Sequence, residues 1–205
     1  MALNKHQQRT EETRRKLLSA GLRIFARTGF EASRIEDIAA EAGHSRGAFY
    51  ANFDTKEDLF FALLEQQAGK RVKLLQTLLE GVESPEERLR VLREFYVGRV
   101  GDRQWVMLTL EFKLFALRHG NLRAKLASSH RRIRASMNME ALEKLLPVRH
   151  FDQATKEMEK VILEVVLNGL VLEHAYDPKR ISEQQAIAML GRVFDVFIRD
   201  RPGRP

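Results

Sequence analysis

Apolar residues recur along this chain at the three- and four-residue spacing of amphipathic helices, and no segment alternates in the manner of a β-strand. Glycine and proline positions that end helices separate these stretches. The pattern predicts an all-α protein of about nine helices, near residues 10–28, 34–41, 45–51, 55–80, 84–101, 103–118, 121–146, 152–175 and 182–199.

Several predicted helix starts carry side chains that can bond to the free N–H groups of a first turn. The serine-to-glutamate or serine-to-glutamine spacing of a capping box occurs at Ser33–Glu36, Ser84–Glu87 and Ser182–Gln185. Other residues suited to the N-cap position are Thr55, Asn121 and Asp152. These signals predict where the corresponding helices begin.

The first three predicted helices are short and the later ones long, which predicts two domains, residues 1–54 and 55–205. The second helix has one apolar stripe, formed by Ile35, Ile38, Ala39 and Ala42. Gly43 follows as a turn residue, and Ser45 can cap the next short helix. Two short helices joined by such a turn form a helix-turn-helix, whose second helix suits the DNA major groove. We therefore expect a DNA-binding domain, followed by a larger helical domain for ligand binding and dimerisation.

The segment from Ile35 to Leu59, IEDIAAEAGHSRGAFYANFDTKEDL, closely resembles the DNA-binding signature of the TetR family of bacterial transcriptional repressors. The residues in family positions are Ile38, Ala39, Ala42, Gly43, Ser45, Gly47, Tyr50, Phe53, Lys56 and Leu59. The resemblance covers roughly residues 10–70, and the rest of the chain agrees only in length and helical character. Three residues depart from the family pattern: Asn52 stands where many relatives carry histidine, Ala51 stands where some carry a second aromatic residue, and His44 replaces the commoner apolar turn residue.

The resemblance implies which side chains meet DNA. Arg46 would form a bidentate contact with guanine, Tyr50 would touch a phosphate or a thymine methyl group, and Lys56 would meet the DNA backbone. Ser33 would cap the second helix, and Gly47 would allow a close approach to DNA. The implied DNA-binding residues are Ser33, Arg34, Ser45, Arg46, Gly47, Ala48, Tyr50, Asn52 and Lys56.

Composition excludes some chemistry and leaves other chemistry open. The chain has no cysteine, which excludes disulfides and thiolate metal sites. It has neither a signal-peptide core nor an apolar stretch of membrane-spanning length, so we expect a cytoplasmic protein with no membrane partner. The net charge of +7 equals the number of bases in one segment without acids, namely Lys113, Arg118, Arg123, Lys125, Arg131, Arg132 and Arg134. An anionic ligand could explain this segment, although a solvated helix face is the more ordinary explanation.

One motif imitates an enzyme signature. Residues 43–47 read G-x-S-x-G, the spacing of the nucleophile elbow in serine hydrolases, but that elbow requires a strand before the serine. A helical stripe precedes Ser45 here instead. The six histidines also lack the H-E-x-x-H spacing of a zinc site. We therefore predict no catalytic residue, no metal and no cofactor.

The predicted helix 103–118 is apolar on nearly all sides, which indicates a central position in a bundle. Glu111 interrupts it, and a carboxylate there must be paired, protonated or available to a ligand. It could pair with an arginine of the next helix, or it could be a polar handle in an effector pocket. The pocket would be lined by Trp105, Leu108, Glu111, Phe112, Phe115 and His130. In the second case, Glu111→Ala would change the effector response and leave the DNA affinity of the free protein unchanged.

The last two predicted helices are apolar on more than one face, so one face must be buried outside the subunit. An isologous homodimer interface is the economical explanation, and the family resemblance implies the same. The expected interface residues are Val161, Val165, Leu172, Leu190, Phe194 and Phe197. Two recognition helices related by a twofold axis would read a palindromic site in double-stranded DNA.

The sequence as a whole thus predicts a homodimeric repressor that an unidentified small-molecule effector releases from a palindromic operator. The effector would act by shifting the population of conformers, and the helix that starts at Lys56 would be the lever. Two alternatives stay open: an activator, or a ligand-binding bundle or enzyme with a vestigial DNA module. Steep salt dependence of DNA binding would argue against the vestigial module.

Overall fold

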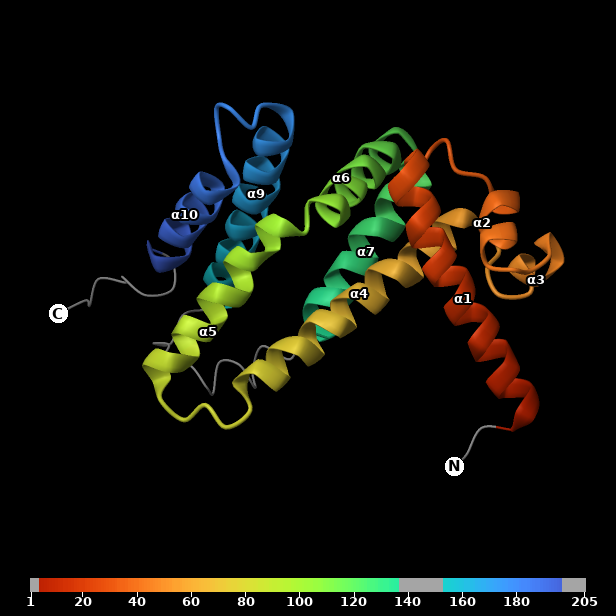
Figure 1. Cartoon of the computed structure of the whole chain (residues 1–205), viewed down its shortest axis with the longest axis horizontal. Helices are drawn as coiled ribbons and strands as arrows, with labels where there is room; N and C mark the ends of the chain where they lie inside the picture. Colours follow the sequence, from red (N-terminus) through yellow and green to blue (C-terminus); the bar gives the residue numbers. More distant parts are fainter. Residues whose placement is uncertain (1–3, 137–152, 197–205) are drawn as a thin grey trace. The chain divides into compact units, whose positions relative to one another are not determined.

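The helical content agrees with the predicted all-α class. The computed structural model describes residues 4–136 and 153–196. These ranges contain nine α-helices, one 3₁₀-helix and no strand (Figure 1). In chain order they are α1 (Lys5–Thr28), α2 (Ile35–Glu41), α3 (Arg46–Tyr50), α4 (Lys56–Leu79), α5 (Pro85–Val97), η1 (Gly98–Gly101), α6 (Arg103–Arg118), α7 (Gly120–Ser136), α9 (Gln153–Tyr176) and α10 (Glu183–Phe194).

α1 begins earlier than the apolar periodicity indicates. The Asn4 side chain accepts a hydrogen bond from the backbone N–H of Gln7 at 2.8 Å, and the Gln7 side chain accepts one from the backbone N–H of Asn4 at 2.9 Å. This capping box starts the helix at Lys5. The first turns of α1 are polar, so the spacing of apolar residues could not predict a helix there.

Residues 137–146 of the predicted helix 121–146 lie outside the described residues, and so does the predicted cap Asp152.

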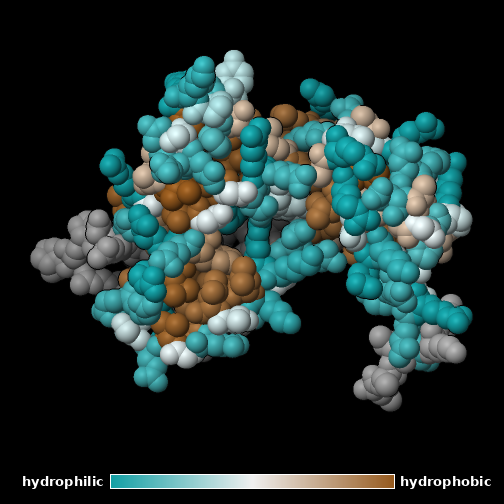
Figure 2. All heavy atoms as spheres, viewed as in Figure 1, coloured by the Kyte–Doolittle hydropathy of each residue, from teal (hydrophilic) through white to brown (hydrophobic). Residues whose placement is uncertain are grey.

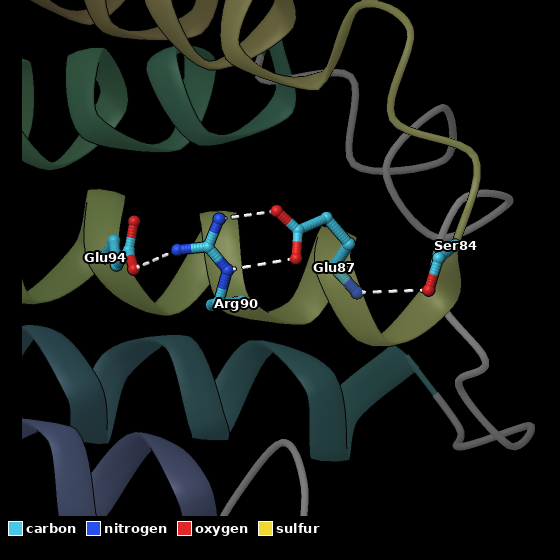
Figure 3. A network of polar contacts seen from close by, with 4 residues as sticks. All are labelled: Ser84, Glu87, Arg90 and Glu94. Atoms are coloured by element: carbon cyan, nitrogen blue, oxygen red, sulfur yellow. Dashed lines mark hydrogen bonds and ion pairs between the residues drawn. The ribbon is translucent and has the colours of Figure 1, made fainter.

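Two of the three predicted capping serines do cap their helices. Ser182 and Gln185 form the complete box at the start of α10, which confirms that prediction. Ser84 caps α5 by accepting a hydrogen bond from the backbone N–H of Glu87 at 3.4 Å. The Glu87 carboxylate does not close this capping box, because it pairs with Arg90 instead. Arg90 also pairs with Glu94 in the next turn of the helix (Figure 3).

The third predicted box, Ser33–Glu36, is wrong. α2 has Arg34 at its N-cap position and no side-chain cap. The Ser33 side chain is buried, and its hydroxyl donates to the carbonyl of Phe30 at 2.6 Å. Sequence spacing alone cannot tell an inward-turned serine from a capping one. The predictions for two further N-caps differ in outcome. Thr55 accepts a hydrogen bond from the backbone N–H of Asp58 in the first turn of α4, as predicted. Asn121 is not an N-cap, because α7 already begins at Gly120.

The chain divides into two compact units, and neither is continuous in sequence. Unit 1 comprises residues 1–70 and 108–136, and unit 2 comprises residues 71–107 and 137–205. α4 and α6 therefore have residues in both units. Unit 1 extends beyond the predicted boundary at residue 54, because side chains of α4 and α6 complete its core.

Aromatic rings make up the centre of unit 1. Phe60 of α4 and Phe112 of α6 stack with their centroids 4.0 Å apart, and Phe30 meets the ring of Phe112 edge-on at 4.6 Å. Phe25 of α1 lies 5.3 Å from Phe30. Each such aromatic pair contributes about 0.5–1.5 kcal/mol beyond the area that it buries. The cluster ties α1 and the turn that follows it to α4 and α6.

Unit 2 has a separate core, in which α10 packs against α9 and α5. Leu92, Leu163 and Phe194 are buried together there. The hydroxyl of Tyr96 donates to the carbonyl of Leu163, and Arg93 pairs with Asp195 at 2.9 Å. In Figure 2 the surface over α1 to α3 is mostly hydrophilic, whereas hydrophobic patches interrupt the surface of unit 2.

Candidate nucleic-acid interface

α2 and α3 form the predicted helix-turn-helix. Ser45 is the N-cap of α3 and accepts a hydrogen bond from the backbone N–H of Ala48 at 3.2 Å. The serine of the G-x-S-x-G motif thus serves as a helix cap. Gly43 takes φ +72° in the turn, a conformation that disfavours other residues. Ile38 and Phe49 are fully buried beneath the pair, so the opposite side of α3 is left at the surface.

Arg46 is the principal polar side chain on the exposed side of α3. Its guanidinium nitrogen Nη1 lies 3.0 Å from Oε1 of Glu36, and Nη2 donates to the hydroxyl of Tyr50 at 3.3 Å. These two partners raise the pKa of Arg46 above its ordinary value, with the Tyr50 hydrogen bond as the larger cause. Tyr50 is itself 43% exposed. Arg46 and Tyr50 therefore present one ordered polar surface.

The neighbouring positions have different surroundings. A Cβ atom at Gly47 would meet nothing closer than Oγ of Ser45 at 3.7 Å, so packing does not require glycine there. Asn52 donates from its side-chain amide to the carbonyl of Ala48 at 2.8 Å, and its own carbonyl accepts from Arg14 at 3.1 Å. The partners of Asn52 thus lie within the protein. Arg34 is among the most exposed side chains of the module.

The structure corrects the expectation for Lys56. Its ammonium group donates to the backbone carbonyls of Phe30 at 2.8 Å, Glu31 at 2.8 Å and Ser33 at 3.0 Å. Three hydrogen bonds use every proton of an ammonium group, so none is left for a phosphate. Partial burial lowers the pKa of Lys56 below its ordinary value, against the effect of nearby carboxylates. Lys56 and the buried Ser33 thus have their hydrogen-bond partners within the module.

Glu111 holds the same loop from α6. Its Oε1 atom accepts hydrogen bonds from the backbone N–H groups of Phe30 at 2.7 Å and Glu31 at 3.4 Å. A Cβ atom at Gly29, which has φ +79°, would lie 2.7 Å from the same oxygen. We call residues 29–33, held by Lys56 and Glu111, the clamped turn.

The expected ion pair of Glu111 with an arginine of the next helix is wrong for the described part of α7, because its partners are backbone amides. The expected role of Glu111 in an effector pocket stays a prediction, and so does the expected effect of Glu111→Ala on the effector response. Sequence reasoning missed these partners because they lie about 80 residues away along the chain.

The residues predicted to line the effector pocket have different surroundings. Phe112 is fully buried in the core of unit 1, and Phe115 packs 5.0 Å from Phe30. Both residues thus pack against Phe30 in the turn that precedes α2, within the core of unit 1. Leu108 is buried in unit 1 and Trp105 in unit 2. His130 lies on α7, and its side chain is outside the described part.

Sequence analysis did not single out a partly buried polar cluster in unit 2. Nε of Arg99 is buried and has no hydrogen-bond partner among the described residues. Burial lowers the pKa of Arg99, and the charge of Arg71, which itself pairs with Asp102, lowers it further. The guanidinium lies 5.8 Å from the ring of Tyr96, whose pKa is raised by burial. The available signal was an arginine inside the mostly apolar run 95–100.

The expected dimer residues separate into two groups. Val161, Val165 and Leu172 of α9 are exposed. Leu190 and Phe194 of α10 are buried in the core of unit 2, so their assignment to an interface is wrong. An apolar periodicity cannot distinguish which of two apolar faces is turned inward. Phe197 lies outside the described residues.

The described residues contain neither a candidate membrane-spanning helix nor a candidate metal site. None of their helices is long and apolar enough to cross a bilayer. Within the same ranges, no group of three or more histidine, aspartate and glutamate side chains is arranged to hold a metal ion.

Comparison with known proteins identifies the family. Residues 17–63 match the family model described as bacterial regulatory proteins, tetR family. Residues 85–199, more than half of the chain, match the model described as BetI-type transcriptional repressor, C-terminal. The chain belongs to the TetR family, whose members are DNA-binding transcriptional regulators and not enzymes.

Individual relatives match to different extents. The HTH-type transcriptional regulator AcrR of Shigella flexneri is 34% identical over 45% of this chain and 42% of its own. An uncharacterized HTH-type transcriptional regulator of Bacillus subtilis, YerO, is 33% identical over 38% of this chain and 28% of its own. The chain thus spans less than half the length of these relatives. The nicotine-responsive repressor HdnoR of Paenarthrobacter nicotinovorans is 23% identical over 90% of this chain and 97% of its own.

Solved structures share the fold over nearly the whole chain. A putative TetR-family regulator from Rhodococcus sp. has a TM-score of 0.69 at 24% identity, covering 92% of this chain and 99% of its own. FadR from Bacillus subtilis in complex with stearoyl-CoA has a TM-score of 0.62 at 16% identity, covering 92% and 99%. A putative regulator from Saccharomonospora viridis in complex with choline has a TM-score of 0.64 at 21% identity, covering 93% and 97%.

Proposed function

We propose that this protein is a homodimeric transcriptional repressor, which a small-molecule effector releases from a palindromic operator. The observation that carries the proposal is the exposed, ordered pair of Arg46 and Tyr50 on the second helix of a helix-turn-helix. An arginine in this position can donate two hydrogen bonds to a guanine in the major groove. Such a protein works where chromosomal DNA is, in the cytoplasm.

The proposed set of DNA-contacting residues is smaller than the set that the resemblance implied. Arg46 and Tyr50 would meet base edges or thymine methyl groups, with Gly47 and Ala48 at the surface of closest approach. Arg34 and Ser45 would contribute contacts to the DNA backbone at the ends of the two helices. We leave out Ser33, Asn52 and Lys56, because their side chains are engaged within the protein.

Dimerisation would use the exposed apolar stripe of α9. Met158, Val161, Val165 and Leu172 recur at helical spacing and are all exposed. An exposed apolar row of this kind gains free energy when a second copy covers it. A twofold axis through this surface would place two copies of α3 for the two halves of a palindrome.

The effector would bind within unit 2, where Arg99 has a buried N–H group without a partner among the described residues. Buried polar groups of this kind usually find a partner, and a ligand can supply one. Relatives of the same fold are described in complex with stearoyl-CoA and with choline, which differ in charge and size. The chemical class of the effector is therefore not carried over from them.

Release would follow from a population shift. An effector that binds one conformer better than another moves the equilibrium by that difference in affinity and no more. α4 and α6 contribute residues to both units, and each holds the clamped turn through one side chain. Lys56 and Glu111 are thus the contacts through which a shift in these helices would reach the helix-turn-helix.

The test is fluorescence anisotropy with the DNA upstream of the protein's own gene and a scrambled duplex, at two salt concentrations. We expect specific binding that weakens steeply with salt. Arg46→Ala should lose about five- to 150-fold in affinity for the upstream duplex, because a bidentate base contact is worth about 1–3 kcal/mol. Arg90→Ala removes the same charge from the surface of α5 and should bind as the wild type does.

Two results would contradict the proposal. One is equal affinity for the upstream and scrambled duplexes, combined with no sequence enriched from a random pool. The other is full specific affinity in Arg46→Ala, which would mean that α3 does not read the bases.

A further inference from the structure

Glu36 is not among the predicted DNA-binding residues, yet it contacts the side chain that we assign to base reading. Its Oε1 atom lies 3.0 Å from Nη1 of Arg46, and its Oε2 atom lies 4.0 Å from Nε of Arg34. Arg46 is also held at Nη2 by the hydroxyl of Tyr50, with the guanidinium 5.4 Å from the tyrosine ring. The guanidinium of Arg46 is thus fixed at both of its terminal nitrogens.

This arrangement lies at the surface. The side chain of Arg46 is 62% exposed and that of Glu36 is 46% exposed. Exposed ion pairs contribute little to folding, because water screens them and ordering two long side chains costs entropy. The consequence of the contact is therefore the orientation of Arg46 rather than the stability of the module.

We propose that Glu36 is a positioning residue that sets sequence specificity, because it orients Arg46 toward a guanine. This inference rests on the proposed DNA-binding function. A guanidinium group carries more N–H protons than Glu36 and Tyr50 engage, so protons remain for O6 and N7 of the base. Since Arg46 is ordered beforehand, less rotamer entropy is lost when it meets that base.

The charge of Glu36 also lowers the affinity for DNA of any sequence. DNA phosphates repel a carboxylate beside the recognition helix on any duplex. An Arg46 held by Glu36 is also less free to swing to a phosphate. Glu36 therefore improves the fit to one base and weakens attachment to all other sequences.

The experiment begins with selection of a preferred duplex from a random pool by the wild-type protein. Each G·C pair of that duplex is then replaced in turn. The pair whose replacement weakens the wild type but not Arg46→Ala identifies the base that Arg46 reads. Dissociation constants at this pair are measured for the wild type, Glu36→Gln, Asp37→Asn and Glu36→Gln/Arg46→Ala.

We expect Glu36→Gln to lose about 1.5- to fivefold of the discrimination at that pair, the range typical of an exposed ion pair. It should bind the scrambled duplex at least as well as the wild type does. Asp37→Asn removes the same charge from the same helical turn, and Asp37 has no ion pair within the described ranges, so it should keep wild-type discrimination. In the Arg46→Ala background, Glu36→Gln should change discrimination no further.

Undiminished discrimination in Glu36→Gln, or an equal loss in Asp37→Asn, overturns the inference. Uniform weakening on every duplex with a lowered melting temperature also overturns it, because that pattern marks a structural role. A wild-type protein that enriches no sequence contradicts the proposed function itself, and the role of Glu36 falls with it. That result is seen before any variant is compared.

Discussion

Two side chains of opposite charge hold the clamped turn, and they do so by complementary chemistry. Lys56 donates to backbone carbonyls, and Glu111 accepts from backbone amides of the same residues. Backbone groups between helices have no helical partners, so these side chains satisfy them where water is partly excluded. A lysine that resembles a phosphate contact in sequence is thus a structural residue.

Replacing Lys56 should therefore reduce stability before it affects DNA binding directly. We expect Lys56→Met to lower the free energy of unfolding by about 2 kcal/mol, because hydrogen bonds from a charged donor are lost and three carbonyls are left unsatisfied. Lys70→Met, at an exposed position of the same helix, should unfold as the wild type does. Urea denaturation measures both. Unchanged stability with uniformly weaker DNA binding would restore Lys56 as a phosphate contact.

At the scale of elements, the basic segment from Lys113 to Arg134, which spans parts of α6 and α7, forms ion pairs with α4. Lys125 pairs with Asp58, and Arg132 pairs with Glu65 at 3.1 Å. The acids and the bases are each one heptad apart, so the two pairs lie along one seam between α4 and α7. Part of the segment's positive charge is thus balanced by α4. This accounts for two of its seven bases without an anionic ligand.

The pair at Asp58 predicts a pH dependence. Partial burial alone would raise the pKa of Asp58, but hydrogen bonds from Lys125 and Thr55 lower it below its ordinary value of 3.8. Between the lowered pKa of the folded state and the ordinary pKa of the unfolded state, Asp58 is protonated more in the unfolded chain than in the folded one. The stabilisation is therefore complete above about pH 4. It is lost as the pH falls through the lower, folded-state pKa.

We therefore expect Asp58→Asn to be less stable than the wild type by about 1 kcal/mol at pH 7. The difference should be the same at pH 5 and smaller at pH 3. Urea denaturation at these three pH values measures it. Asp54→Asn, a nearby exposed aspartate, serves as the control. A difference that stays constant down to pH 3 would contradict the assigned pKa.

At the scale of the whole molecule, assembly decides whether two recognition helices can act together. The exposed stripe of α9 is the surface that we propose for dimerisation, since Leu190 and Phe194 are already buried within the subunit. A dimer on a palindromic operator makes two sets of DNA contacts, one from each copy of α3. Loss of the dimer should therefore weaken DNA binding strongly while each subunit remains folded.

We expect Leu172→Glu to sediment as a monomer in analytical ultracentrifugation, because a carboxylate in an apolar interface must be desolvated without a partner. Leu117→Glu makes the same exchange at another exposed position, on α6, and should remain a dimer. Circular dichroism checks that both variants fold. If Leu172→Glu stays dimeric, the interface lies elsewhere.

Local patterns in the sequence determined the elements and the family. Helical periodicity, the turn glycine and the cap at Ser45 depend on residues a few positions apart, so they can be read directly from the chain. The helix-turn-helix between Ile35 and Tyr50 and the capping box at Ser182 are of this kind, and the structure contains both.

Packing between distant segments determines which side chains are turned inward and what they contact there. Glu111 and Lys56 find their partners in a turn distant along the chain, and Leu190 lies on the buried one of two apolar faces. Spacing in sequence carries no information on contacts between separate helices, because these depend on how the helices pack. The sequence thus determined the helices and the recognition module, and packing determined which charged side chains hold that module in place.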